Sequence, residues 1–209
     1  MKKLISGQSF EGTITSLDLQ EMKDTAEFHY GEFLRALGYD FSNDPNMKGT
    51  PRRVTKMYME EVCKGTYLKA PKITSFENQS SYDGIVFQGN IVLKSLCSHH
   101  MAPIKGRCHV AYIPGKRVAG LSKLNRIVDW FSRRPQLQEQ LTMQIHDYLK
   151  EILEDSVGIA VYIEAEHSCV SMRGVEHDSI MSTVKLSGVF LDQQNKSRDE
   201  FYQMINKLK

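Results

Sequence analysis

The stretch GIVFQGNIVLKSLCSHHMAPIKGRCHVAYIPG, residues 84–115, decides the fold class of this chain. Its two outer parts, residues 84–97 and 106–115, are rich in β-branched and aromatic residues and read as strands. Because only a short segment separates them, we expect neighbouring strands of an antiparallel pair. That segment holds a cysteine and two adjacent histidines, so the same residues raise the question of a metal site.

Helical patterns precede this pair. In residues 16–40 apolar side chains recur at steps of three and four, which predicts a helix with Ser16 as its N-cap and Gly38 as its end. The expected apolar face consists of Leu19, Met22, Ala26, Tyr30, Phe33 and Leu37. A second helix is predicted over residues 49–65, with Thr50 as N-cap and Pro51 at the first helical position.

After residue 115 the sequence predicts two helices, then two strands and a final helix. Residues 119–155 predict two helices, broken near Pro135, and the second repeats apolar residues at every fourth position. Residues 157–170 alternate as a strand with one apolar face, and residues 181–191 predict a last strand before a polar C-terminal helix. This order indicates an α+β fold in which an antiparallel sheet packs with a helical pair and is preceded by N-terminal helices.

Composition limits the classes of function. With 209 residues, 41% of them apolar and 25% charged, the chain is typical of a globular protein. A net charge of +2 gives no general attraction to nucleic acid, and no apolar stretch is long enough for a membrane span or a secretory signal. The four cysteines are too few and too scattered for a disulfide framework, so we expect a cytoplasmic location.

Soft or borderline metal donors gather in two short segments: Cys97, His99, His100, His167 and Cys169. On a regular strand His167 and Cys169 point to the same face. Cys97 and His100 reach one ion only if the chain turns at residues 98–100, which the following Pro103 allows.

Zinc suits a donor set of thiolates and imidazole. Three ligands, Cys97, His100 and Cys169, would leave one coordination position for water, and His99 and His167 would remain as acid–base groups. We expect the other two cysteines, Cys63 and Cys108, in the core. Cys108 as a fourth ligand would instead make the site a closed, structural one.

A second cluster could bind an anion. Ser122 is a candidate N-cap, and Lys123 and Arg126 lie three apart on the same side of that helix. A hydroxyl and two cations at a helix start could hold phosphate groups. Further positive charge comes from Arg173, Arg53 and Lys56. Taken singly, each basic residue fits a solvated surface role better than a phosphate contact.

A third cluster is Gln138 and Glu139, early in the second helix of the pair. A carboxylate can accept two parallel N–H bonds, such as those of the N1–H and 2-amino edge of guanine. The alternative is an ordinary acidic residue that stabilises a helix N-terminus. Spacing alone does not choose between them.

At this point the chain resembles GTP cyclohydrolase I, the type I zinc enzyme. The resemblance rests on LCSHHMAPIKGRCHVAYIPG, GLSKLNRIVDWFSRRPQLQEQLTMQI and EAEHSCVSMRGV, with TPRRVTKMY and PKITSFEN upstream, and it covers residues 45–209. It implies a tunnelling fold, in which subunits join their sheets into a barrel, as a homodecamer of two pentamers with active sites between subunits. We accordingly expect an N-terminal helical region, residues 1–80, and a tunnelling-fold catalytic region, residues 81–209.

The resemblance also implies the reaction: GTP and water give 7,8-dihydroneopterin triphosphate and formate, the first step of pterin and folate-type biosynthesis. Zinc-bound water attacks C8 of the guanine imidazole ring. The implied zinc ligands are Cys97, His100 and Cys169, and the implied proton-transfer residues are His99 and His167, with His167 donating to N7. The implied substrate contacts are Gln138 and Glu139 to guanine and Ser122, Lys123, Arg126, Arg173, Arg53 and Lys56 to the triphosphate.

One position departs from the pattern, because the family commonly reads Cys-Glu-His-His where this chain has Ser98. Two other functions compete with the cyclohydrolase. One is a tunnelling-fold purine or pterin enzyme with altered chemistry. The other is a structural zinc module that binds nucleic acid, which would need Cys108 as a fourth ligand; the near-neutral charge and the lack of a C-x-x-C pair argue against it.

Overall fold

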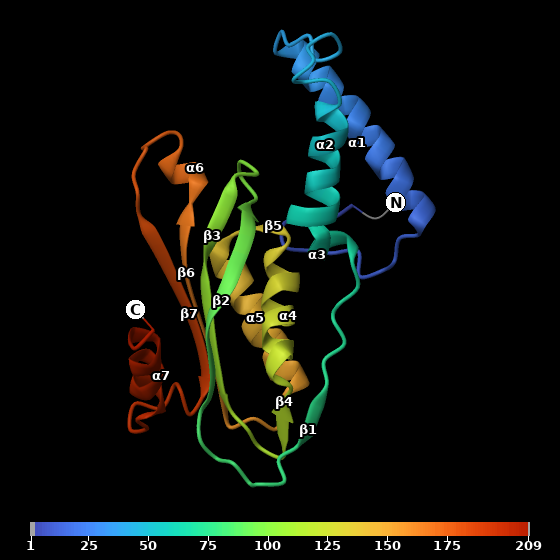
Figure 1. Ribbon diagram of the computed structural model, residues 1–209. Coiled ribbons are helices and arrows are strands. Elements are labelled where there is room, and N and C mark those ends of the chain that lie inside the picture. Colours follow the sequence, from blue (N-terminus) through green and yellow to red (C-terminus); the bar gives the residue numbers. More distant parts are fainter. Residues whose placement is uncertain (1–2, 209) are drawn as a thin grey trace.

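The structure is a computed structural model that describes residues 3–208. Its main sheet has five strands in the order β5-β2-β3-β6-β7 (Figure 1). Four of them are antiparallel neighbours: β2 (Val86–Cys97), β3 (Pro103–Ile113), β6 (Gly158–His167) and β7 (Ile180–Gly188). β5 (Pro135–Gln136) adds to β2 in parallel, so the sheet is mixed and the expected α+β class is confirmed.

Two helices cover one face of this sheet. α4 (Leu121–Ser132) and α5 (Gln138–Ile152) are separated at Pro135, as predicted. The residues of α5 that face the strands are at most 1% exposed, namely Leu141, Ile145 and Leu149, and Leu153 follows directly after the helix. They meet the alternating residues of the strands, namely Leu93, Cys108, Val110, Ile159, Val161 and Ile163. This layer is the main core.

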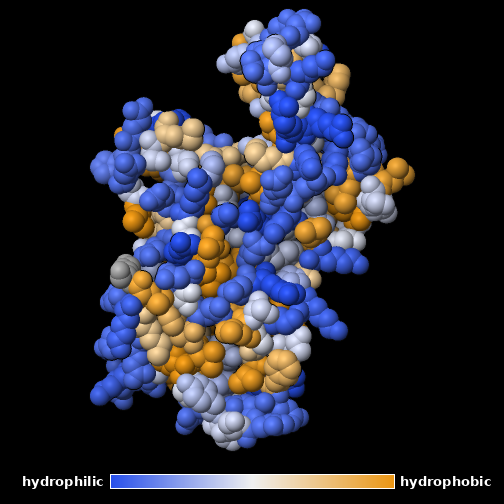
Figure 2. All heavy atoms as spheres, in the orientation of Figure 1, coloured by the Kyte–Doolittle hydropathy of each residue, from blue (hydrophilic) through white to orange (hydrophobic). Residues whose placement is uncertain are grey.

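The opposite face of the sheet is covered over only part of its area. α7 (Ser197–Asn206) places Phe201 and Ile205 against Ala111, Ala160 and Phe190. This second core lies toward the end of the sheet where β3 finishes and β6 begins. In Figure 2 apolar side chains remain visible between α7 and the lower part of the sheet.

The N-terminal helices stand beyond one end of the sheet (Figure 1). They are α1 (Ser16–Ala36), α2 (Thr50–Lys56), a π-helical segment η1 (Met57–Val62) and α3 (Lys64–Tyr67). A two-stranded sheet follows, formed by β1 (Ser75–Glu77) and β4 (Arg117–Ala119). Within residues 3–208 no helix combines the length and the apolar character that a bilayer crossing demands.

Three details of these helices differ from prediction. The N-cap of α1 is Thr15, whose side chain forms a capping box with Asp18, so Ser16 is not the cap. Gly49 rather than Thr50 precedes α2. The second helix does not stop at Gly65, which lies inside α3, where an added Cβ would meet the carbonyl oxygen of Trp130 at 2.0 Å.

The predicted apolar face of α1 is only partly covered. Its buried residues are Gly31 and Leu34, whereas Phe33 and Leu37 are 54% and 58% exposed. The helix packs mainly against α2, which cannot cover the whole stripe. Gly38 ends the helix as predicted, in a left-handed conformation with φ of 88°.

Candidate metal centre and active site

The end of β2 forms the turn on which the expected metal site depends. Cys97 is the last residue of β2, and residues 98–100 form a turn before β3. The turn is closed by two main-chain bonds, from Met101 N–H to the Cys97 carbonyl and from Cys97 N–H to the Ala102 carbonyl, each 2.8 Å. Met101 adopts a φ of 53°. The predicted turn is therefore present, and it brings His100 back toward Cys97.

The second donor segment is not the regular strand that the sequence suggested. β6 ends at His167, which lies opposite Ile104 at the start of β3. Cys169 belongs to α6 (Ser168–Ser171), a single helical turn that begins directly after the strand. The premise that His167 and Cys169 share one strand face is therefore wrong. The helical turn carries Cys169 toward Cys97 instead.

Three donors converge at this end of the sheet. One ligand atom each from Cys97, His100 and Cys169 lie within 4.8 Å of one another. Bonds of about 2.0–2.3 Å at tetrahedral angles would put two donors about 3.3–3.8 Å apart, so the donors need to approach one another by at most about 1.5 Å. Burial raises the pKa of the Cys169 thiol, and its hydrogen bond with Cys97 and the like charge of Cys97 raise it further. The residues fit a metal that replaces the thiol protons.

Arg173 places positive charge beside this group. Its Nη1 donates a hydrogen bond to Nε2 of His100 at 2.8 Å. His99 precedes His100 in the turn and is exposed. The centres of the two rings are 6.3 Å apart, in an edge-to-face arrangement. The structure thus brings both residues to the three-donor group, in agreement with their expected positions.

His167 and the start of α5 form the other side of this end. Nε2 of His167 lies 2.8 Å from Oε1 of Gln138, which is 1% exposed. Burial lowers the pKa of His167, and the carboxylate of Glu139 opposes that shift. Glu139 itself is exposed in the first turn of α5. His167, Gln138 and Glu139 therefore belong to the same end of the sheet as the metal donors.

The expected anion-binding residues of α4 are not part of this group. α4 begins beside β4, at the end of the sheet opposite Cys97, and its length of about 18 Å separates Ser122 from the level of β5. Ser122 and Arg126 are exposed, and Nζ of Lys123 donates to the carbonyl oxygen of Lys72. Ser122 is also not the N-cap, since Gly120 occupies that position without a side-chain bond.

Arg53 and Lys56 lie on α2 in the N-terminal helices. Both are exposed, and Arg53 bonds to the carbonyl oxygen of Asn46 and the hydroxyl of Thr50 in its own segment. No recorded bond of the described residues joins either side chain to the metal donors. Thr55, between them, is buried and lines a cavity with Met101 of the metal turn, so α2 adjoins that turn.

The remaining cysteines are in the core, as predicted. Burial raises the pKa of Cys63 to about 11, and Cys108, 0% exposed, has its pKa raised by burial alone. Cys108 pairs with Ile91 and Ile163 in the middle of the sheet, far along β3 from the turn. It does not belong to the three-donor group, so the closed four-ligand site is not supported.

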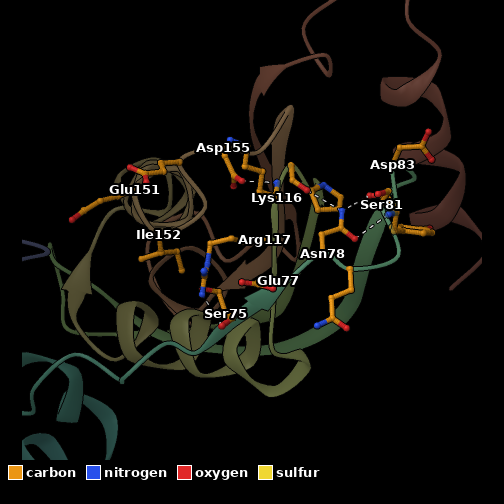
Figure 3. Close-up of a pocket in the computed structure, with 15 residues that line it drawn as sticks. Ser75, Glu77, Asn78, Ser81, Asp83, Lys116, Arg117, Glu151, Ile152 and Asp155 are labelled. Atoms are coloured by element: carbon orange, nitrogen blue, oxygen red, sulfur yellow. Dashed lines mark hydrogen bonds between the residues drawn. The ribbon is translucent and has the colours of Figure 1, made fainter.

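A broad cavity of about 1200 Å³ lies at the opposite end of the molecule (Figure 3). Its lining comes from β1 and the segment after it, from the β3–β4 connection with the start of β4, and from the end of α5 with the residues after it. Asp155 accepts a bond from the main-chain N–H of Lys116 at 2.5 Å, and Arg117 bonds to Ser75. Some of its polar groups are thus held to one another, and none of the metal donors lines it.

Comparison with known proteins decides the family. The family model described as GTP cyclohydrolase I matches residues 26–206. The chain belongs to the GTP cyclohydrolase I family, which is a family of enzymes. Curated relatives named GTP cyclohydrolase 1 agree with this assignment. The relative from Shewanella sp. (strain ANA-3) is 44% identical over 173 residues, which cover 82% of this chain and 79% of that protein.

Two further members of the GTP cyclohydrolase I family are similar over longer or comparable ranges. The relative from Sulfurihydrogenibium sp. (strain YO3AOP1) is 46% identical and covers 83% of this chain and 90% of its own length. That from Enterobacter sp. (strain 638) is 42% identical and covers 92% and 86%. Among solved structures, the archaeosine synthase QueF-Like in the apo form reaches a TM-score of 0.39 at 16% identity, covering 48% of this chain and 92% of that one, too weak a likeness to bear on the fold.

Sequence reasoning missed the partners of Gln138. Thr142 donates to the main-chain carbonyl of Gln138 at 2.8 Å and shares a 2.7 Å hydrogen bond with Thr183 of β7. A threonine four residues after a helix start commonly bonds back to that carbonyl, so Thr142 carried a usable signal. Thr183 carried none, because its role depends on how β7 packs against α5.

Proposed function

We propose that this chain catalyses the zinc-dependent hydrolysis of GTP to 7,8-dihydroneopterin triphosphate and formate. Membership of the GTP cyclohydrolase I family supports GTP as the substrate. The observation that carries the finer proposal is the convergence of Cys97, His100 and Cys169 beside His167 and Glu139. Zinc is the metal proposed because two thiolates and one imidazole match its preferences and leave a coordination position for water. A zinc ion bound there would lower the pKa of water toward neutrality and so supply the nucleophile for C8.

The side chains around the donors would hold the substrate and move protons. Glu139, exposed at the start of α5, would accept the N1–H and 2-amino hydrogens of guanine, with Gln138 next to it. His167 would donate a proton to N7, which makes C8 more electrophilic, and His99 would serve as the second proton-transfer group. Arg173, beside His100, would hold the triphosphate by charge.

We further propose that a complete site needs more than one copy of the chain. The expected phosphate contacts Ser122, Lys123 and Arg126 lie at the opposite end of the sheet from the donors of their own chain. A neighbouring copy could supply them. This favours the ring-shaped assembly expected of a tunnelling fold, as a decamer of two pentamers built from the catalytic region, residues 81–209, with residues 1–80 as the helical region outside it.

The edges of the sheet support that assembly. β5 pairs with β2 only at Leu96 and Cys97, and the outer edge of β7 has no partner strand in residues 3–208. Unpaired strand edges are normally covered or joined. β7 runs antiparallel to β2, so β7 of one copy could pair with β2 of the next in the same sense as the other main pairs. Repetition of this contact closes a barrel without free edges.

The test is turnover of GTP by protein whose zinc content has been measured. Zinc-loaded protein should release formate and form a product that becomes a fluorescent pterin after oxidation. Protein stripped with a chelator should lose both products and regain them when zinc is returned. Fully metallated protein that leaves GTP intact would refute the proposed function, and release of a different purine product would favour the altered-chemistry alternative.

A further inference from the structure

The side-chain amide of Gln138 is fully engaged inside the protein. Its Nε2 donates to the carbonyl oxygen of Met181 at 3.0 Å, to Thr183 Oγ1 at 3.1 Å and to the carbonyl oxygen of Ile163 at 3.3 Å. Its Oε1 lies 2.8 Å from Nε2 of His167. At 1% exposure the residue has little surface left for a substrate.

These partners determine which way the amide points. Two of them are main-chain carbonyls, which only accept hydrogen bonds, so the NH₂ group must face Met181 and Ile163. The amide oxygen must then face His167. Since that oxygen also only accepts, Nε2 of His167 must carry the hydrogen that joins them. The tautomer of His167 therefore follows from the neighbouring main chain.

We propose that Gln138 is a positioning residue that holds the His167 ring by accepting a hydrogen bond from its Nε2–H, so that Nδ1 is the ring nitrogen left for the substrate. This rests on the proposed function, in which His167 donates a proton to N7 of guanine. In the step, the Nδ1–H bond of the imidazolium breaks and an N–H bond forms at N7. The histidine is left as the neutral Nε2–H tautomer that Gln138 already binds, so the ring need not rotate. Recognition of guanine then falls to Glu139.

The same contacts tie His167 to the edge strand of the sheet. Met181 and Thr183 both belong to β7, and Thr183 bonds to Thr142 of α5, which bonds back to the carbonyl of Gln138. Burial makes each bond of such a network more costly to break. The orientation of His167 is thereby linked to the strand whose outer edge would meet the next copy of the chain.

The test compares Gln138→Leu with Gln136→Leu. Gln136 is a matched control because it is also a buried glutamine, 0% exposed, but within residues 3–208 its Nε2 donates to the carbonyls of Phe131 and Arg134 and not to His167. For Gln138→Leu we expect kcat to fall about 10- to 100-fold, because a misplaced proton donor costs that much. KM for GTP and the calorimetric affinity of the metal-free protein for GTP should both stay within about twofold.

Two kinetic outcomes would overturn the proposal. A raised KM with unchanged kcat, together with lost discrimination between GTP and inosine triphosphate, would show that the Gln138 side chain reads guanine. An equal loss of kcat in Gln136→Leu would show a general effect of removing a buried amide from this region. Zinc content is measured in both variants, so that a loss of metal is recognised as such.

A spectroscopic measurement tests the assignment without relying on turnover. Histidine is labelled with ¹⁵N in the assembled protein, and solid-state NMR distinguishes protonated from unprotonated ring nitrogens. The His167 signal, identified by its loss in His167→Asn, should show a protonated Nε2 in the parent and a changed pattern in Gln138→Leu. A protonated Nδ1 with a bare Nε2 in the parent would refute the positioning role. Absence of GTP turnover in the parent would instead refute the proposed function and leave this result standing.

Discussion

The two ends of the sheet differ in how much of a site a single chain assembles. At the end where β2 finishes, three metal donors lie within 4.8 Å and His167 is held by a buried amide. At the other end, Ser122 and Arg126 point away from the core on an exposed helix face, beside no metal donor. Groups that carry out bond chemistry need exact positions, which one folded chain can supply. Groups that hold a flexible triphosphate can come from a neighbouring subunit.

The largest effect is expected when one of the three donors is removed from the end of the sheet where β2 finishes. Cys169→Ser should abolish the proposed zinc binding and lower turnover by at least about 1000-fold, because a metal at this position would contribute several kcal/mol to the reaction. Metal analysis and the formate assay measure both effects. Cys108→Ala is the control, since Cys108 lies in the core, and it should keep its metal. If Cys108→Ala were the variant that lost the metal, the open three-ligand site would be wrong.

A second test concerns the start of α4, at the other end of the sheet, and asks whether its residues contribute to the active site of a neighbouring subunit. Lys123→Ala should keep its zinc and lose about 10- to 100-fold in kcat/KM for GTP, the usual cost of a charge-assisted bond. Refolding Lys123→Ala together with Cys169→Ser should restore turnover, because some interfaces then combine an intact donor group with an intact lysine.

Two results would contradict shared sites. One is a mixture that stays as inactive as its components although mass analysis shows mixed oligomers. The other is a Lys123→Ala protein with normal kcat/KM. Subunits mixed after folding, without exchange, provide the negative control.

The expectations from sequence were accurate where periodicity carries the information. The strands, the break at Pro135 and the buried stripe of α5 are all present, because alternation and four-residue steps record burial directly. The predicted N-caps of α1 and α2 were each displaced by one residue and that of α4 by two, since neighbouring residues compete for the cap and local geometry decides. β5, two residues long, left no pattern to recognise.

The three clustered donors could be predicted better than the geometry that brings them together. Spacing and family resemblance pointed to Cys97, His100 and Cys169, and these donors do converge. The route by which Cys169 arrives, through a helical turn after β6, was missed because a single turn has no periodicity of its own. The partners of Gln138 were missed because two of them come from β7, more than forty residues away.

A smaller effect is expected at the turn itself. Ser98→Glu should leave zinc content unchanged and change kcat by a few-fold, because Ser98 precedes the two histidines without being a donor itself. Ser98 is half-buried and lines a cavity with residues of the N-terminal segment and Pro135, so a longer acidic side chain has room. Metal analysis and steady-state kinetics decide, with Ser98→Gln as the uncharged control of similar size. Loss of zinc in Ser98→Glu would place this position within the ligand shell.

The smallest effect concerns the middle of the molecule, between the two ends. His146 of α5 is 2% exposed and bonds to Asp147 and to Ser187 of β7. Burial lowers its pKa, Asp147 opposes this, and Lys185 and Lys150 lower it further. A pKa that is lower in the folded than in the unfolded state gives stability above the ordinary histidine value, near 6.5, and that stability is lost as the pH falls below it.

The melting temperature should therefore drop by a few degrees more between pH 7.5 and 5.5 in the parent than in His146→Gln. The glutamine can still form a hydrogen bond with Ser187 and cannot titrate, so other ionisable groups cancel in the difference. Parallel pH profiles for the two proteins would mean that His146 does not couple α5 to β7 through its charge.

The two donor segments lie far apart along the chain, which predicts the order of folding and metal binding. The whole of α4, β5 and α5 separates Cys97 from Cys169, and Cys169 directly follows β6, which pairs with β3 beside β2. Long-range strand pairing is slow relative to local helix formation. Refolding in the presence of the ion should therefore show sheet formation first and metal capture last, with little acceleration of the early phases by the metal.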